Sequence, residues 1–282
     1  MNDNIIVTPL GTVSPYCKNN LNCPGFLIQY KDNKILLDCG NGITNLLNFP
    51  DDLNNLTIII SHLHPDHYGD LLSIAQTSYV FNRLGYVNEK IKVYIPEGDK
   101  INVSEDYKDT DGWAMSRRVE KNLIDFDYLL GLEKTSYLEF VPYKKNDKIN
   151  YDELIISFQK NPHQLTTYST KLETEGIKVV YSSDTGYKGN CLEEFAKDVN
   201  LLICESTFLK GQVKNEDNHL FAFEAGKIAK KANVDKLLLT HFWPEIDKQK
   251  YVEEAKTYFS NTEYAEEGKK LILRRKYENN NK

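Results

Sequence analysis

Short runs of apolar and β-branched residues, separated by turn-forming residues, dominate the first hundred positions of the chain. Strands are predicted where these runs occur, at residues 5–9, 26–30, 34–38, 57–61 and 92–95. The Lys-Asp-Asn turn at residues 31–33 suits a hairpin between the second and third of them. Residues 70–84 instead carry apolar side chains at helical spacing, and Gly85 is a stop signal, so this segment predicts a helix.

In the second half of the chain, predicted strands alternate with predicted helices. Strands are expected at residues 137–142, 154–160, 165–173, 178–182, 201–204, 236–240 and 270–274. Helices are expected at residues 191–197, 219–232 and 248–259. This succession predicts one layered α/β sandwich domain over residues 1–282. The charge-rich segment 99–135 is predicted to be a helical insertion, either a solvated helix packed on the sheet edge or a lid.

The composition adds little specificity, because 40% hydrophobic and 27% charged residues are ordinary for a globular protein of 282 residues. The net charge of −6 disfavours a nucleic-acid binder without catalysis, since phosphate contacts need clustered Lys and Arg. Five cysteines without C-x-x-C spacing indicate reduced thiols, and a Cys17–Cys23 pairing is not expected. The first twenty residues lack the pattern of a signal peptide, and no apolar run is long enough for a bilayer. A cytoplasmic protein without a membrane partner is therefore expected.

Three of the six histidines lie in one hexapeptide, His62-Leu63-His64-Pro65-Asp66-His67, directly after a predicted strand. A loop that leaves a strand can direct imidazoles and a carboxylate toward one point, which suits a cation such as zinc. The alternative is a polar turn that is rich in histidine by coincidence, and the scarcity of histidine elsewhere argues against it.

Three later apolar strands also end in a side chain that can bind a metal or transfer a proton. They run into Asp184, Glu205 and His241. Because strand ends aim side chains from rigid elements, this recurrence predicts convergence on one site. His163 follows another strand and is interpreted as a ligand rather than a surface histidine. His219 is expected to open a helix capped by Asp217-Asn218, a position that suits an anion, or else to be simply exposed there.

With these residues in hand, the chain resembles the metallo-β-lactamase superfamily. The signature H-x-H-x-D-H appears as His62, His64, Asp66 and His67, and the later ligands match His163, Asp184 and His241 in the family's order. Asp38-Cys39-Gly40 is similar to the family's early D-x-G element. The resemblance covers nearly the whole chain and implies an αββα four-layer sandwich (the metallo-β-lactamase fold).

The resemblance also implies a site for two divalent metal ions, with Zn²⁺ as the first choice and Mn²⁺ or Fe as alternatives. His62, His64 and His163 would hold the first metal, Asp66, His67 and His241 the second, and Asp184 would bridge them. Asp38 would fix the tautomer of a ligand histidine. The nucleophile would be a metal-bridging hydroxide.

Within the superfamily, Glu205-Ser206-Thr207-Phe208 followed by His219 resembles the ribonuclease Z-like branch, in which a Glu–His pair is implicated in proton transfer. Asp66, Glu205 and His219 are accordingly predicted as catalytic residues, and a phosphodiester in a small molecule or RNA as the substrate. The chain lacks a Gly-rich basic arm, which puts transfer-RNA processing in doubt. A homodimer is an open expectation of this resemblance.

Two other classes of function compete with a phosphodiesterase. The first is a hydrolase of the same fold that acts on a lactone, a thioester or a β-lactam; the missing signal peptide argues against a secreted β-lactamase. The second is a metal-binding scaffold or sensor without catalysis, which the complete ligand set disfavours.

Overall fold

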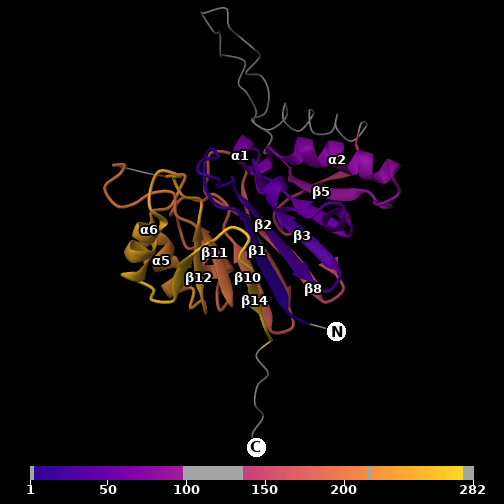
Figure 1. Cartoon of the computed structure of the whole chain (residues 1–282). Helices are drawn as coiled ribbons and strands as arrows, with labels where there is room; N and C mark the ends of the chain where they lie inside the picture. The colour runs from indigo at the N-terminus through magenta and orange to yellow at the C-terminus, as the bar shows by residue number, and fades with distance from the viewer. Residues whose placement is uncertain (1–2, 98–135, 215–216, 276–282) are drawn as a thin grey trace, which may run out of the picture.

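Two β-sheets pack face to face, and helices cover the outer face of each sheet (Figure 1). The computed structural model describes residues 3–97, 136–214 and 217–275. The layers follow the order helix, sheet, sheet, helix, so the predicted αββα sandwich is confirmed. The predicted insertion at residues 99–135 lies outside the described residues.

Within the described residues, the first sheet contains seven strands in the order β14-β1-β2-β3-β4-β5-β6. Its strands are β1 (Ile5–Gly11), β2 (Gly25–Tyr30), β3 (Asn33–Leu37), β4 (Leu56–Ile59), β5 (Ile91–Pro96), β6 (Leu138–Tyr143) and β14 (Leu271–Leu273). Strands β3 to β6 run parallel, so their carboxyl ends meet at one edge.

The second sheet has a similar plan, with the described strands in the order β13-β12-β11-β10-β9-β8-β7. Its strands are β7 (Lys148–Tyr151), β8 (Leu154–Lys160), β9 (Tyr168–Thr174), β10 (Ile177–Tyr181), β11 (Leu201–Glu205), β12 (Leu237–Thr240) and β13 (Thr262–Tyr264). Strands β10 to β13 are parallel, which again brings several carboxyl ends to one edge.

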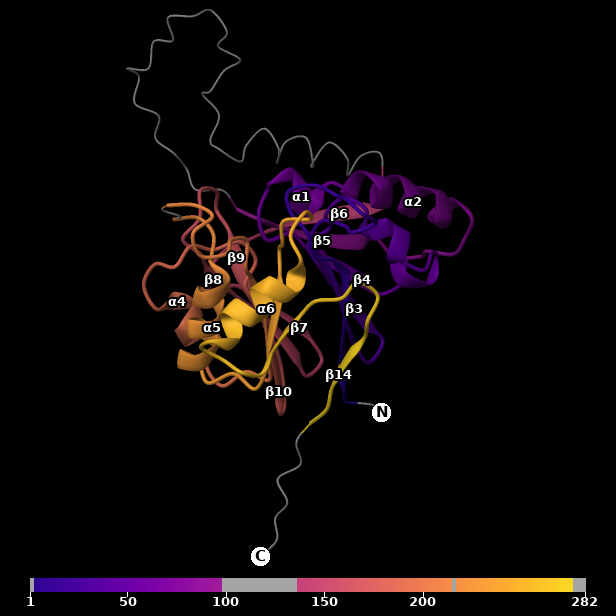
Figure 2. The same cartoon turned by 60° about the vertical axis from the view of Figure 1, so that its left-hand side comes forward.

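The helices cover apolar surface on the two outer faces. On the first sheet lie α1 (Pro65–Tyr68), α2 (Leu71–Arg83) and the 3-10 turns η1 (Ile43–Leu46) and η2 (Asp51–Leu53). On the second lie α4 (Cys191–Phe195), α5 (Ala222–Lys231) and α6 (Lys248–Lys256), with α5 and α6 in the foreground of Figure 2. Buried apolar side chains form one cluster between the sheets and one under each helical layer, and this packing holds the strand ends rigidly in place.

The prediction that His219 opens a helix is wrong. Helix α5 begins at Ala222, and the carboxylate of Glu224 accepts the backbone N–H of Phe221 at 3.0 Å. His219 therefore lies in the loop before α5, outside the first turn where a helix dipole acts. The short elements β7, β13 and α1 were not predicted, because they lack the apolar run that marks the equally short β4, β12 and β14.

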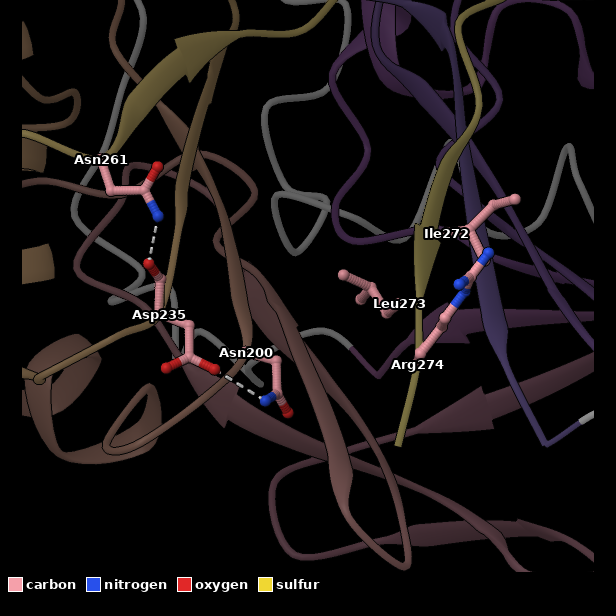
Figure 3. Close-up of a pocket in the computed structure, with 6 residues that line it drawn as sticks. All are labelled: Asn200, Asp235, Asn261, Ile272, Leu273 and Arg274. Carbon is pink, nitrogen blue, oxygen red and sulfur yellow. Dashed lines mark hydrogen bonds between the residues drawn. The ribbon is translucent and has the colours of Figure 1, made fainter. Parts of the chain in front are cut away.

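A shallow hollow lies where the strands of the second sheet begin (Figure 3). It is lined by Asn200, Asp235, Asn261, Ile272, Leu273 and Arg274. Asn200 and Asn261 directly precede strands β11 and β13, and Asp235 lies two residues before β12, so the hollow is at the edge opposite the carboxyl ends of these parallel strands. None of the predicted site residues lines it.

As for membranes, no helix in the described ranges has the length and apolar run that crossing a bilayer requires.

Candidate metal centre

The histidine-rich segment follows the carboxyl end of β4 and leads through residues 60–64 into α1. His64 has extended backbone and precedes Pro65, which occupies the first position of α1 because that position needs no N–H donor. Asp66 and His67 lie within this single turn. The short strand and the abrupt turn thus direct His62, His64, Asp66 and His67 toward the facing sheet.

The first group of potential ligands consists of His62, His64, His163 and Asp184. Nε2 of His62 lies 3.0 Å from Nδ1 of His64, and Nε2 of His163 lies 3.4 Å from the same Nδ1. His163 is held by its other nitrogen, because Nδ1 donates to the backbone carbonyl of Asn218 at 2.9 Å. That bond leaves the lone pair of Nε2 directed at the cluster.

The second group consists of Asp66, His67 and His241. The Nε2 atoms of His67 and His241 are 3.4 Å apart, and Oδ2 of Asp66 lies 3.6 Å from the first and 3.8 Å from the second. Oδ2 of Asp66 also accepts a hydrogen bond from the hydroxyl of Ser14 at 2.8 Å. Ser14 comes from the loop after β1, so a distant segment holds this carboxylate.

Asp184 lies between the two groups, and each of its oxygens faces one of them. Oδ2 is 3.5 Å from Nε2 of His62, in the first group. Oδ1 is 3.3 Å from Nε2 of His67 and 3.1 Å from Nε2 of His241, in the second. Oδ1 is fully buried and has no hydrogen-bond partner among the described residues. A buried oxygen of this kind is rare without a ligand, because its desolvation is otherwise uncompensated.

Asp38, which follows β3, orients His67 from the side away from the cluster. Its carboxylate is fully buried and accepts from Nδ1 of His67 at 2.8 Å, from Tyr181 Oη at 2.7 Å, and from the backbone N–H and hydroxyl of Ser61 at 2.7 and 2.9 Å. The bond to Nδ1 leaves Nε2 to face Asp184. This contact agrees with the orienting role that the sequence resemblance assigned to Asp38.

A second carboxylate, Glu205, contacts His219 directly and reaches His241 through the hydroxyl of Thr207. Oγ1 of Thr207 is 2.6 Å from Oε2 of Glu205 and 2.8 Å from Nδ1 of His241. Because an ionised carboxylate only accepts, Thr207 donates to Glu205 and accepts from His241. Nδ1 of His219 is 3.2 Å from Oε1 of Glu205. One buried carboxylate therefore sets the ring orientation of two histidines.

Two of these residues adopt a left-handed backbone conformation, which is uncommon for residues other than glycine. Asp38 has φ 59° and His241 has φ 64°, both in the left-handed region. Each such residue costs about 1–3 kcal/mol and persists only when its surroundings enforce it. Both lie immediately after a parallel strand, so the strain accompanies the turn that points their side chains into the centre.

The charges of the centre are unbalanced without cations. Asp38, Asp66, Asp184 and Glu205 form a buried cluster of carboxylates, and no described lysine or arginine forms a salt bridge with any of them. For His67, burial lowers the pKa, but Asp184, Asp66 and Asp38 outweigh burial and raise it well above the usual value. One protonated imidazole is too little to balance this cluster, and buried charges without partners are costly.

The other cluster histidines favour the neutral form in which imidazole binds metals. Burial lowers the pKa of His62 well below its usual value, that of His64 to about 4, and that of His241. Burial raises the pKa of Asp184, but positive charge on the histidines beside it, which His67 retains, reverses this and holds the pKa well below its usual value. Neutral imidazoles with an ionised carboxylate between them are a donor set that fits divalent metal ions.

All seven predicted ligands lie in these two adjoining groups, and the predicted pair Glu205 and His219 lies beside them. Sequence reasoning did not single out Ser14, Ser61, Thr207 or Tyr181, whose hydroxyls orient the ligands. Serine, threonine and tyrosine are common residues, so only Thr207, next but one to Glu205 in the sequence, had any signal.

Comparisons with known proteins agree with this architecture. Residues 33–242 match the family described as "Beta-lactamase superfamily domain". Ribonuclease Z of Clostridium perfringens is 28% identical over 297 aligned positions, which cover 88% of this chain and 92% of the relative. The probable metallo-hydrolase YhfI of Bacillus subtilis is 26% identical over 83% of this chain and 86% of its own length.

Solved structures show the same fold. The crystal structure of YhfI superposes with a TM-score of 0.80 at 24% identity, covering 96% of this chain and all of the other. The short form of human tRNase Z superposes with a TM-score of 0.67 at 17% identity, covering 95% of this chain and 99% of the other.

Proposed function

The chain belongs to the metallo-β-lactamase superfamily, in which it is ribonuclease Z-like, and we propose that it is a dinuclear metal-dependent hydrolase of phosphodiesters. The observation that carries the dinuclear proposal is the placement of Asp184. Its two oxygens face separate ligand groups, and Oδ1, which has no hydrogen-bond partner among the described residues, faces His67 and His241. A carboxylate that only served one metal would not need ligands of a second group around its other oxygen.

We assign the proposed ligands to two ions according to the distances between their donor atoms. His62, His64 and His163 would hold one ion and Asp66, His67 and His241 the other, with Asp184 shared. Two divalent cations supply Lewis acidity when bound and lower the pKa of a water molecule so that it can act as a nucleophile near neutral pH. Zn²⁺ is the proposed metal, because neutral imidazoles outnumber carboxylates in this set.

His219 is the proposed proton donor to the leaving oxygen. It is partly exposed, whereas Glu205 behind it is buried. With Nδ1 directed at Oε1 of Glu205, Nε2 is the nitrogen that can pass a proton to a substrate. The carboxylate stabilises the protonated imidazole and keeps the ring in place, and it is itself held by the backbone N–H groups of Thr185 at 2.7 Å and Leu220 at 3.1 Å.

This proton donor is the reason to favour a phosphodiester. An alkoxide released from a phosphodiester is a poor leaving group and gains from protonation, and general acids typically contribute about 10²–10⁴ in rate. The relatives named ribonuclease Z and tRNase Z support RNA as one source of such a bond. A small phosphodiester fits the same chemistry.

The test is a substrate panel on protein whose metal content has been measured. The panel contains bis-p-nitrophenyl phosphate, a cyclic nucleotide, an oligoribonucleotide, a lactone and a thioester. We expect hydrolysis of the phosphodiesters, loss of activity with a chelator and recovery with Zn²⁺. Turnover of the lactone or thioester alone would replace the phosphodiesterase by a carboxylic-ester hydrolase, and no turnover of any substrate by protein with two metals would favour a scaffold or sensor.

A further inference from the structure

Two cysteines at the ends of a small hairpin lie close together beside the metal centre. Sγ of Cys17 is 3.8 Å from Sγ of Cys23. Between them, Lys18 and Leu21 pair through two backbone hydrogen bonds, and Asn19 and Asn20 form the left-handed turn with φ 54° and 61°. We propose that Cys17 and Cys23 form a thiol-modification site that small disulfides oxidise to an intramolecular disulfide, and that this oxidation weakens the hold of Ser14 on Asp66.

The two thiols differ in access, and this sets the order of reaction. Cys17 is exposed and Cys23 is buried. Burial raises the pKa of the Cys23 thiol, so Cys23 reacts as a thiolate only rarely. A dissolved disulfide therefore meets Cys17 first, and Cys23 is positioned to act second.

The exchange needs no other reactant. The Cys17 thiolate attacks one sulfur of a small disulfide such as oxidised glutathione, forming a mixed disulfide and expelling one thiolate. Cys23 then loses its proton and attacks the sulfur of Cys17, which forms the intramolecular bond and expels the second thiolate. Both released thiolates take up protons, so two protein thiols are oxidised and one small disulfide is reduced to two thiols.

Packing decides which cysteine must move. A Cβ atom added to Gly11 would lie 1.7 Å from the carbonyl oxygen of Cys23, and one added to Gly40 would lie 2.7 Å from its carbonyl carbon. The backbone of Cys23 is therefore packed tightly between Gly11 and Gly40 and has little room to move. A covalent S–S bond of about 2 Å requires the sulfurs to approach further. That movement falls to Cys17, which must give up the hydrogen bond from its Sγ to the carbonyl of Asn41.

Movement of Cys17 reaches the metal centre by a short path. Ser14 precedes Cys17 by three residues, and its hydroxyl donates to Oδ2 of Asp66 at 2.8 Å. Its backbone N–H donates to the carbonyl of Phe242, the residue after His241, at 2.9 Å. Displacement of the hairpin shifts Ser14, and Asp66 then loses the hydrogen bond that orients its carboxylate. Loss of such an outer hydrogen bond typically weakens metal affinity about 10–100-fold.

The purified protein, whose metal content has been measured, is treated with oxidised glutathione. Its free thiols are then blocked under denaturing conditions, and the protein is digested with trypsin. Cleavage after Lys18 places Cys17 on peptide 1–18 and Cys23 on peptide 19–31, so a disulfide joins two peptides that mass spectrometry detects. Metal affinity is measured in parallel with a chromogenic chelator, before and after oxidation. Cys191→Ser is the matched control, because it removes another exposed cysteine away from the hairpin.

We expect linked peptides in the wild type and in Cys191→Ser, and about tenfold weaker binding of one metal after oxidation, reversed by dithiothreitol. Cys23→Ser should instead stop at a glutathione adduct on Cys17. A wild-type protein that also stops at this adduct, or that does not react, refutes the disulfide. Linked peptides with unchanged metal affinity refute the effect on Asp66. The peptide masses do not depend on hydrolytic activity, so failure of the proposed function leaves this result readable.

Discussion

Replacement of Thr207 by valine tests the hydrogen-bond relay that orients His241. Valine has nearly the shape of threonine and removes only the hydroxyl. That hydroxyl accepts from Nδ1 of His241 at 2.8 Å and donates to Glu205 at 2.6 Å, in a site where Thr207 is only 6% exposed. Without it, the buried N–H of His241 has lost its acceptor, and the ring gains freedom to place its proton on Nε2, the atom that faces Asp184.

The size of the effect follows from the cost of an unsatisfied buried group. A buried N–H left without a partner costs about 1–3 kcal/mol. If this cost is partly relieved by the wrong tautomer, which cannot bind a metal through Nε2, affinity for the metal of the second group falls about 10–100-fold. The free energy of unfolding of the metal-free protein should also fall, by about 1–3 kcal/mol, because the same hydrogen bonds are lost there.

The control is Thr207→Ser, which keeps the hydroxyl and removes a methyl group. Metal affinities are measured by competition with a chelator, and stability by urea unfolding. We expect the serine variant to bind both metals almost as tightly as the wild type, whereas the valine variant binds one of them clearly more weakly. Equal affinities in the two variants would show that His241 does not depend on this hydroxyl, and the relay would be refuted.

Three further outcomes are expected. His219→Ala should retain both metals and lose about 10²–10⁴ in rate on an unactivated phosphodiester while losing less on bis-p-nitrophenyl phosphate, whose leaving group needs no proton; unchanged activity on the unactivated substrate would refute the proton-donor role. Asp66→Ala should bind fewer than two metals per chain by elemental analysis, and full occupancy would contradict its assignment as a ligand. Removal of metal with a chelator should lower the melting temperature at neutral pH, because the buried carboxylates lose their cations, and an unchanged melting temperature in calorimetry would contradict the charge argument.

The elements predicted from the sequence agree best with the structure where the apolar spacing of a segment matches the face that tertiary packing buries. The helix predicted at residues 70–84 is α2, Leu71–Arg83, since its apolar spacing is also its buried face. The strand predicted at residues 165–173 begins three residues later, at Tyr168. The helix predicted at residues 219–232 begins at Ala222, because the loop before it pairs with the segment after β11: Phe208 and Leu220 share a backbone hydrogen bond of 3.1 Å. Such a long-range contact leaves no periodic trace in the sequence.

Sequence alone determined the alternation of strands and helices and the kinds of side chain at the strand ends, because apolar periodicity and rare histidines are properties of a linear chain. Which residues meet was decided only by the tertiary structure: Ser14 beside Asp66, Thr207 beside His241, and Cys17 within reach of Cys23. These contacts depend on how two sheets pack and how loops cross between them. Hydroxyl and thiol groups are common, and their roles arise from distances of a few ångströms that residue order does not encode locally.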